Sequence, residues 1–197
     1  MIKIALSGSI GMGKSTVARM FERAGIPVFD ADTEVRRLQA AGGALVEPIA
    51  ARFPDTVNDG VIDREKLAQL VLQDPLQLAE LEMIVHPAVS AAREKFVDAH
   101  RDAPALLFEI PLLFETGGEG AFDKVVVVSA PSEVQRMRVL ARSGMTQDKL
   151  DSILDRQLPD EEKRRRADFV IDTGADLSTT ETQVRNILAC LGLLPSG

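Results

Sequence analysis

The chain has 197 residues, of which 45% are apolar and 27% charged, a composition typical of a soluble globular protein long enough to bury its own core. A single cysteine excludes a scaffold of intrachain disulfides, so we expect a reducing, cytoplasmic location. The net charge of −7 argues against binding to nucleic acid or to anionic membranes. No apolar run is long enough to span a membrane, and the first residues resemble a strand rather than an export signal.

Short apolar runs alternate along the chain with segments of helical periodicity. The runs predicted as strands are residues 2–6, 26–29, 105–108, 125–128 and 169–171, and the predicted helices are 14–24, 64–73, 76–85, 88–99, 133–142, 147–158 and 180–191. Near-continuous apolar strands are typical of a parallel sheet that is buried on both faces. We therefore predict an α/β fold with a five-stranded, mostly parallel sheet flanked by helices.

Two segments are too long to be simple connections between neighbouring strands. Residues 33–103 have a mostly helical pattern, and we expect them to form an inserted lobe. Residues 133–167 contain two helical patterns joined at 143–146, where Thr146 is expected to cap the second helix, and we expect a helical lid there. The core is then formed by residues 1–32, 104–132 and 168–197.

Two smaller expectations concern the C-terminal part of the chain. The charged run 160–166 is expected to be a solvated surface helix. Cys190 lies among Ile187, Leu188 and Leu191 at helical spacing, so it is expected to pack in the core.

Residues 8–15 match the phosphate-binding pattern G-x-x-x-x-G-K-S/T between a predicted strand and a predicted helix. The glycines allow backbone conformations that turn N–H groups toward phosphate oxygens. We expect Lys14 to be exposed in the empty loop and to contact the β- and γ-phosphates, and the Ser15 hydroxyl to bind Mg²⁺. Contacts with ATP are predicted for Gly8, Ser9, Ile10, Gly11, Met12, Gly13, Lys14, Ser15 and Thr16. Mg²⁺ is expected to arrive with ATP, and no tightly bound cofactor is expected.

The loop alone does not separate kinases from GTPases, transport ATPases or switch proteins. The sequence contains no N/T-K-x-D tetrapeptide for reading guanine and no L-S-G-G-Q stretch of a transporter ATPase. The small size and the two helical insertions favour a small-molecule kinase, which needs a lid to keep water from the phosphoryl group.

Two acids follow the second predicted strand, at the sheet edge where open α/β folds bind ligands. Of Asp30 and Asp32, one could contact an acceptor hydroxyl and the other could support the Mg²⁺ shell. The alternative is a turn at the strand end in which Asp32 caps the next helix.

Taken together, these features resemble the dephospho-coenzyme A kinase family over almost the whole chain. The resemblance rests on the phosphate loop, residues 27–32, Asp59-Gly60 with 63–67, His86-Pro87, residues 110–115, Arg138 and Arg142 with Gly144 and Thr146, Gln157, and residues 161–163 and 167–172. It implies transfer of the γ-phosphoryl group of ATP to the ribose 3′-hydroxyl of dephospho-coenzyme A. It also implies a nucleotide-binding core, a substrate lobe at 33–103 and a lid at 133–167.

The resemblance further implies roles for particular residues. Catalytic roles fall to Asp32, which would activate the acceptor, and to Lys14 and Arg142. Substrate contacts are implied for Asp30, Asp32, His86, Pro111, Leu112, Leu113 and Glu115, and phosphate contacts from the lid for Arg138 and Arg142. Relatives often carry Asp-Asn where this chain has Asp172-Thr173, so backbone groups are expected to hold the adenine here.

Several of these residues have simpler interpretations. His86-Pro87 fits a break between two helices, the leucines of 111–115 fit a core, and an arginine pair on a helix fits a solvated face. Glu109 ends an apolar run as a Walker B acid does, a role that the resemblance does not require.

Two other functions stay open from the sequence. A kinase resembling shikimate kinase also pairs a phosphate loop with D-x-D, but that family's glycine triplet is missing, and His86-Pro87 and residues 111–115 are unexplained by it. The other is a non-catalytic, nucleotide-dependent switch. The expected partners are ATP and dephospho-coenzyme A, with no nucleic acid and no membrane, and the chain is expected to be a monomer or a small homo-oligomer.

Overall fold

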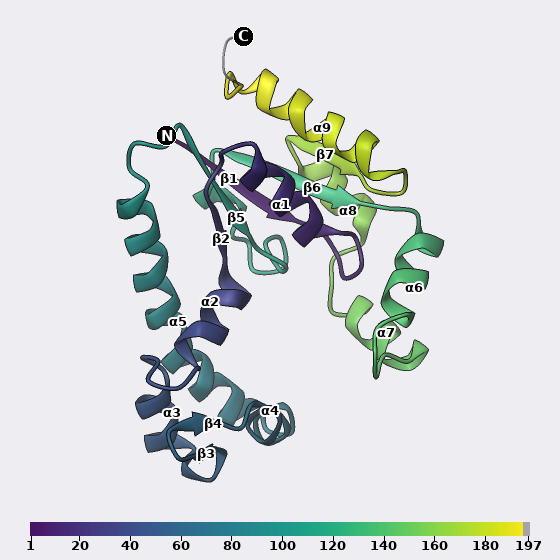
Figure 1. Cartoon of the computed structure of the whole chain (residues 1–197). Helices are drawn as coiled ribbons and strands as arrows, with labels where there is room; N and C mark the ends of the chain where they lie inside the picture. Colours follow the sequence, from purple (N-terminus) through teal and green to yellow (C-terminus); the bar gives the residue numbers. More distant parts are fainter. Residues whose placement is uncertain (195–197) are drawn as a thin grey trace. The chain divides into compact units, whose positions relative to one another are not determined.

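A five-stranded sheet forms the centre of the first of two units in the computed structural model, which describes residues 1–194 (Figure 1). The strand order is β2-β5-β1-β6-β7. The strands are β1 (Ile2–Ser7), β2 (Val28–Asp30), β5 (Ala105–Glu109), β6 (Lys124–Ser129) and β7 (Phe169–Asp172). β1 pairs in parallel with both β5 and β6, and β6 pairs in parallel with β7. All five predicted strands are confirmed, and their bounds move by at most two residues.

Successive side chains along the central strands point to opposite faces of the sheet, and both faces are buried, as the apolar runs predict. Ile4 and Val126 belong to the cluster that contains Phe21 of α1 and residues of α9. Ala5 and Val127, one position along each strand, belong to the cluster on the other face. The helices of this unit are α1 (Lys14–Arg23), α6 (Ser132–Leu140), α7 (Gln147–Leu154), α8 (Asp160–Arg166) and α9 (Leu177–Cys190), with the 3-10 turn η2 (Glu119–Ala121).

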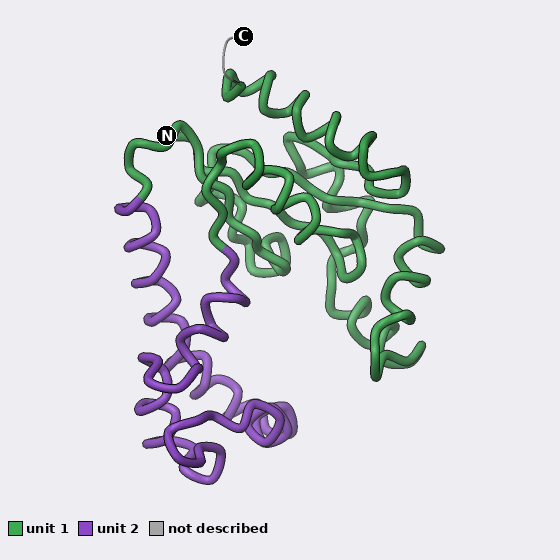
Figure 2. Tube along the Cα trace, in the orientation of Figure 1, with its two compact units in different colours: residues 1–29, 100–197 green, residues 30–99 purple. Residues whose placement is uncertain are grey.

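The second unit spans residues 30–99 (Figure 2). It has its own apolar core. Its elements are α2 (Ala31–Leu38), α3 (Val46–Arg52), η1 (Pro54–Thr56), β3 (Val57–Asn58), β4 (Val61–Ile62), α4 (Arg64–Leu72) and α5 (Pro75–Ala99). The core of this unit is formed by Leu38, Leu45, Ile49, Phe53, Ile62, Leu67 and Val71. The predicted lobe at 33–103 overlaps this unit, whereas residues 133–167 group with the sheet in the first unit.

The predicted helix break at His86-Pro87 is wrong, because α5 is one helix that contains Pro87. Proline removes one helical hydrogen bond and typically costs about 3 kcal/mol in a helix interior. However, residues on both sides of it, such as Ile84 and Val89, pack against the same apolar cluster. This shared packing holds the two halves in one helix, and His86 lies exposed on it.

A short antiparallel hairpin of β3 and β4 was not predicted within the helical lobe. Its turn residues Asp59 and Gly60 have φ values of 49° and 74°. Positive φ at both central positions is typical of two-residue hairpin loops, for which Asp-Gly is a preferred sequence. The Asp-Gly pair between two valine-containing dipeptides was therefore the signal that could have predicted the hairpin.

The three helices expected between residues 133 and 167 are present as α6, α7 and α8. Thr146 caps α7 as predicted, since its Oγ1 accepts a hydrogen bond from Lys149 N at 3.3 Å. The helix predicted to reach residue 158 ends at Leu154 instead. The N–H of Leu158 donates to Glu115 Oε1 at 2.7 Å, and Pro159 has no N–H to continue the helix.

Cys190 is exposed, so its predicted place in the core is wrong. The buried positions of α9 are Thr180, Val184, Ile187 and Leu188, and Cys190 lies beside this stripe at the end of the helix. Within residues 1–194, no helix is long and apolar enough to cross a membrane.

Candidate active site

The loop between β1 and α1 has the backbone that a phosphate site requires. Gly8 has φ +149°, and a Cβ there would lie 2.4 Å from the carbonyl oxygen of Val128, so only glycine fits. Gly13 precedes α1 in the left-handed conformation, with φ 90°. No side chain within residues 1–194 caps this helix end, and the uncapped N-terminus of a helix favours an anion.

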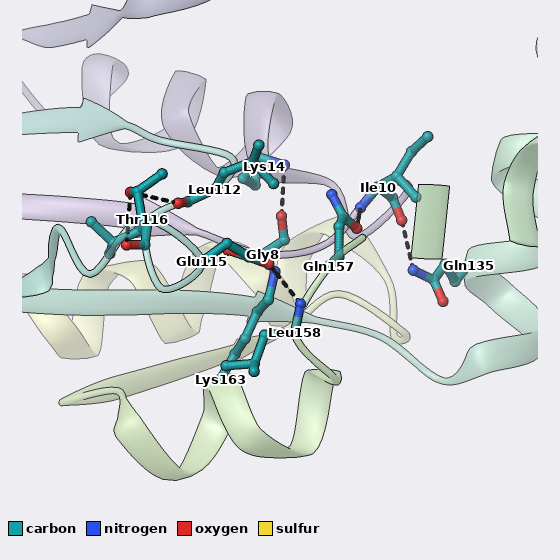
Figure 3. Close-up of polar contacts among 11 residues, drawn as sticks. Gly8, Ile10, Lys14, Leu112, Glu115, Thr116, Gln135, Gln157, Leu158 and Lys163 are labelled. Atoms are coloured by element: carbon teal, nitrogen blue, oxygen red, sulfur yellow. Dashed lines mark hydrogen bonds and ion pairs between the residues drawn. The ribbon is translucent and has the colours of Figure 1, made fainter. Parts of the chain in front are cut away.

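Lys14 is half-buried rather than exposed as predicted, and its Nζ donates to the carbonyl oxygen of Gly8 at 2.8 Å (Figure 3). The ammonium thus lies against the first residue of the loop.

Ser15 Oγ donates to Glu109 Oε1 at 3.1 Å. Glu109 is the last residue of β5 and is 8% exposed. A hydroxyl and a carboxylate at this place are the oxygen ligands that Mg²⁺ prefers, so the residues present fit this ion. The contact supports the Walker B interpretation of Glu109, which the sequence alone left open.

Side chains from distant parts of the chain hold the phosphate loop by its backbone. Gln135 of α6 donates its Nε2 to Ile10 O at 2.8 Å, and Ile10 N donates to Gln157 Oε1 at 3.1 Å (Figure 3). Thr173 Oγ1 donates to Met12 O at 2.8 Å. No pattern in the sequence singles out Gln135, because a contact between a side chain and a distant backbone group leaves no spacing pattern.

A cavity of about 380 Å³ adjoins the loop and is lined by Gly11, Gly13, Thr16, Arg138, Arg142 and Thr173, among others. Arg138 reaches Thr173 twice: Nη1 donates to Oγ1 at 3.0 Å and Nη2 donates to the carbonyl oxygen at 2.6 Å. These bonds hold the Arg138 guanidinium at the cavity wall. Arg142 lines the same cavity with an exposed side chain. The two predicted lid arginines therefore lie at one cavity.

Asp30 ends β2 and Asp32 lies in the first turn of α2, and the cap of this helix is not the residue that the capping alternative names. Asp30, not Asp32, is the N-cap of α2, since its Oδ1 accepts from Asp32 N at 2.9 Å and from Thr33 N at 3.2 Å. Its Oδ2 accepts from Thr33 Oγ1 at 2.6 Å. The Asp32 side chain is exposed and forms no hydrogen bond or ion pair with the described residues. Asp32 and His86 both belong to the second unit.

Residues 111–115 are mostly engaged with the protein itself. Leu113 is 1% exposed and packs in the apolar cluster with Phe114, so its side chain offers no surface to a substrate. Pro111 is half-buried and Leu112 is 44% exposed. The simpler interpretation of these leucines as core thus holds for Leu113 and not for Leu112.

Glu115 forms an ion pair with Lys163, whose Nζ lies 2.7 Å from Glu115 Oε1 (Figure 3). The side chain of Lys163 is fully buried, so the prediction that 160–166 is a solvated helix is wrong at this position. Burial acts to raise the pKa of the Glu115 carboxyl, but Lys163 and the Leu158 N–H outweigh it, and the pKa is lowered. Arg166 pairs with Glu119 and lies over the Phe114 ring, which further attaches α8 to residues 114–119.

Comparison with known proteins agrees with this geometry. The family model described as dephospho-CoA kinase matches residues 2–179. A dephospho-CoA kinase from Mesorhizobium japonicum is 54% identical over 190 residues, which cover 95% of each chain. A second, from Rhodopseudomonas palustris, is 48% identical over 197 residues, covering 99% of this chain and 98% of that one.

Solved structures agree at the level of the fold. A crystal structure of a Thermus thermophilus protein covers 100% of this chain and 98% of its own, with a TM-score of 0.83 and 38% identity. A dephospho-CoA kinase from Campylobacter jejuni covers 95% of each chain, with a TM-score of 0.69 and 25% identity. A shikimate kinase from Acinetobacter baumannii, at 16% identity and a TM-score of 0.54, shares the fold alone. With a matching family model over nearly its whole length and relatives near 50% identity, the chain belongs to the dephospho-CoA kinase family.

Proposed function

We propose that this chain transfers the γ-phosphoryl group of ATP to the ribose 3′-hydroxyl of dephospho-coenzyme A, which yields coenzyme A and ADP. The observation that carries the proposal is the phosphate loop with Lys14 and with Ser15 bonded to Glu109, in a member of this family. Shikimate phosphorylation is not favoured, since the likeness to shikimate kinases extends to the fold alone.

The loop binds the phosphates of ATP through its N–H groups and the uncapped end of α1. Lys14 exchanges its bond to Gly8 O for the β- and γ-phosphates and neutralises charge there. Ser15 and Glu109 would hold Mg²⁺, which when bound screens the negative charge of the phosphates. The cavity lined by Arg138, Arg142 and Thr173 receives the rest of the nucleotide.

Asp32 orients the acceptor hydroxyl and takes its proton. Its side chain is exposed and unengaged by the described residues, whereas the carboxylate of Asp30 is already used by three hydrogen bonds at the start of α2. In a loose phosphoryl-transfer transition state the proton leaves late, so the base acts mainly by orientation. Arg142, at the cavity wall, supplies positive charge to the transferring group. The soluble substrates and the single cysteine favour a cytoplasmic location.

A turnover panel tests the proposal. The purified chain is assayed with ATP and Mg²⁺ against dephospho-coenzyme A, shikimate and nucleoside monophosphates, and the products are identified by mass. We expect saturable turnover with dephospho-coenzyme A alone, and loss of turnover when EDTA removes the metal. Equal rates with another acceptor, or only trace turnover with all of them, would contradict the proposed function.

A further inference from the structure

Gln157 is part of the family pattern, and its side chain contacts the backbone of the phosphate loop. The peptide of Ile10 is held from two sides by glutamine side chains, Gln135 at its carbonyl oxygen and Gln157 at its N–H (Figure 3). Gln135 comes from α6 and Gln157 from the segment between α7 and α8. The two glutamines therefore present opposite ends of their amides to the same residue.

The chemistry of the peptide fixes how the Gln157 amide is turned. A backbone N–H can only donate, so the amide oxygen of Gln157 must face Ile10 and its NH₂ group must face away. This NH₂ carries two N–H donors and finds no acceptor among residues 1–194. In Figure 3 the amide nitrogen of Gln157 points away from Ile10, toward the side of the loop where Lys14 lies.

The surroundings of this NH₂ group indicate which ligand it meets. The Nζ of Lys14 lies 2.8 Å from Gly8 O, so the lysine that serves the β- and γ-phosphates rests against the first residues of the loop. Ile10 belongs to this part of the loop. The NH₂ group of Gln157, held beside Ile10, therefore faces the terminal phosphate of ATP rather than its base. We infer that Gln157 donates a hydrogen bond from its NH₂ group to an oxygen of the γ-phosphate, while its amide oxygen stays fixed by Ile10 N. This inference rests on the proposed function, because it requires ATP in the loop.

The experiment compares the affinities for ADP and for a non-hydrolysable ATP analogue by titration calorimetry with Mg²⁺. Gln157→Leu removes both the donor and the acceptor, and Gln135→Leu is the matched control that removes the other support of Ile10. We expect Gln157→Leu to weaken the ATP analogue about tenfold more than ADP, as for a lost hydrogen bond to a charged group. Gln135→Leu should weaken both nucleotides by the same factor, because Gln135 donates to the protein.

Gln157→Glu separates a phosphate contact from a purely structural support. A carboxylate can still accept from Ile10 N, so a structural role predicts that Glu restores the ATP analogue affinity relative to Leu. A phosphate contact predicts the reverse order, because glutamate cannot donate and brings a negative charge toward the γ-phosphate. Whether Gln157→Leu or Gln157→Glu binds the ATP analogue more tightly decides between the two roles, even if the Gln135→Leu control is too unstable to measure.

Two results would overturn the inference: an unchanged ratio of ATP analogue to ADP affinity in Gln157→Leu, or tighter analogue binding by Gln157→Glu than by Gln157→Leu. Neither would affect the proposed function, provided that the unsubstituted chain binds both nucleotides and phosphorylates dephospho-coenzyme A. A wild-type chain that binds neither nucleotide would instead overturn the proposed function.

Discussion

The ion pair between Glu115 and Lys163 attaches α8 to the segment after β5, and its removal should be measurable as a loss of stability. Lys163 is fully buried, and its Nζ lies 2.7 Å from Glu115 Oε1. Glu115→Ala would leave a buried ammonium without this carboxylate. Breaking a buried pair on one side typically costs about 3–5 kcal/mol, and we expect Glu115→Ala to lower the free energy of unfolding by that amount.

Conservative substitutions at Glu115 and Lys163 distinguish the contribution of the charges to stability from that of the hydrogen bonds. In Glu115→Gln the side-chain oxygen can still accept from Leu158 N and from Lys163, so the expected loss is smaller, about 1–2 kcal/mol. Adding Lys163→Met to Glu115→Gln removes the orphaned charge altogether. Neutral replacements of buried ion pairs are often tolerated, so this double variant should be more stable than Glu115→Ala. The two positions should therefore be strongly non-additive in a double-mutant cycle.

The chain has no Trp or Tyr, so far-ultraviolet circular dichroism in urea is the suitable assay. The lowered pKa of Glu115 also predicts a pH dependence. A carboxylate with a depressed pKa stabilises the fold above its unfolded value, here about 4.5, and loses this contribution as the pH falls through its folded value. The stability difference between wild type and Glu115→Gln should thus be constant near neutral pH and shrink below about pH 4.5. A loss under about 1 kcal/mol for Glu115→Ala would refute this reasoning.

Two further predictions concern the proposed chemistry. Lys14→Ala should abolish nearly all turnover, yet lower the thermal midpoint by only a few degrees, since the Lys14 side chain is half-buried and lies outside the apolar core; a collapse of the midpoint would make Lys14 structural. Asp32→Asn should lower kcat by about 10²–10⁴ with little change in the KM for ATP, and kcat within about threefold of wild type would remove Asp32 from the base role. Asp30→Ala should instead cost about 1 kcal/mol of stability as a lost helix cap.

Local patterns were enough to predict the sheet and the phosphate loop. The five strands are short apolar runs whose alternate residues pack on opposite faces, so their position follows from residues adjacent in sequence. The loop was predicted because its glycines, lysine and serine have fixed spacing between a strand and a helix. Thr146 was predicted as a cap for the same reason, since a cap needs only the next three residues.

The errors at Pro87 and Lys163 have a common physical cause, which is tertiary packing that overrides a local rule. Pro87 should end a helix by its missing N–H, but one apolar cluster holds both halves of α5. Lys163 lies in a run of charges that should be solvated, but Glu115, far away in sequence, gives it a buried partner. Neither outcome leaves a trace within a window of a few residues, so neither could be predicted from the pattern of the run.

The supports of the phosphate loop extend this argument to the site itself. Gln135, Gln157 and Thr173 each bind a backbone group of the loop, at Ile10 or Met12. Any side chain with a suitable donor or acceptor can serve a backbone group, so such contacts impose no sequence motif on the loop that they hold. The motif therefore predicts that phosphates bind here. The position of the loop's backbone, however, depends on contacts with residues more than a hundred positions away. Gln157 differs from Gln135 in the end of its amide that the described residues leave unused: Gln157 keeps an NH₂ donor, which a phosphate oxygen can accept from, whereas Gln135 keeps an acceptor oxygen.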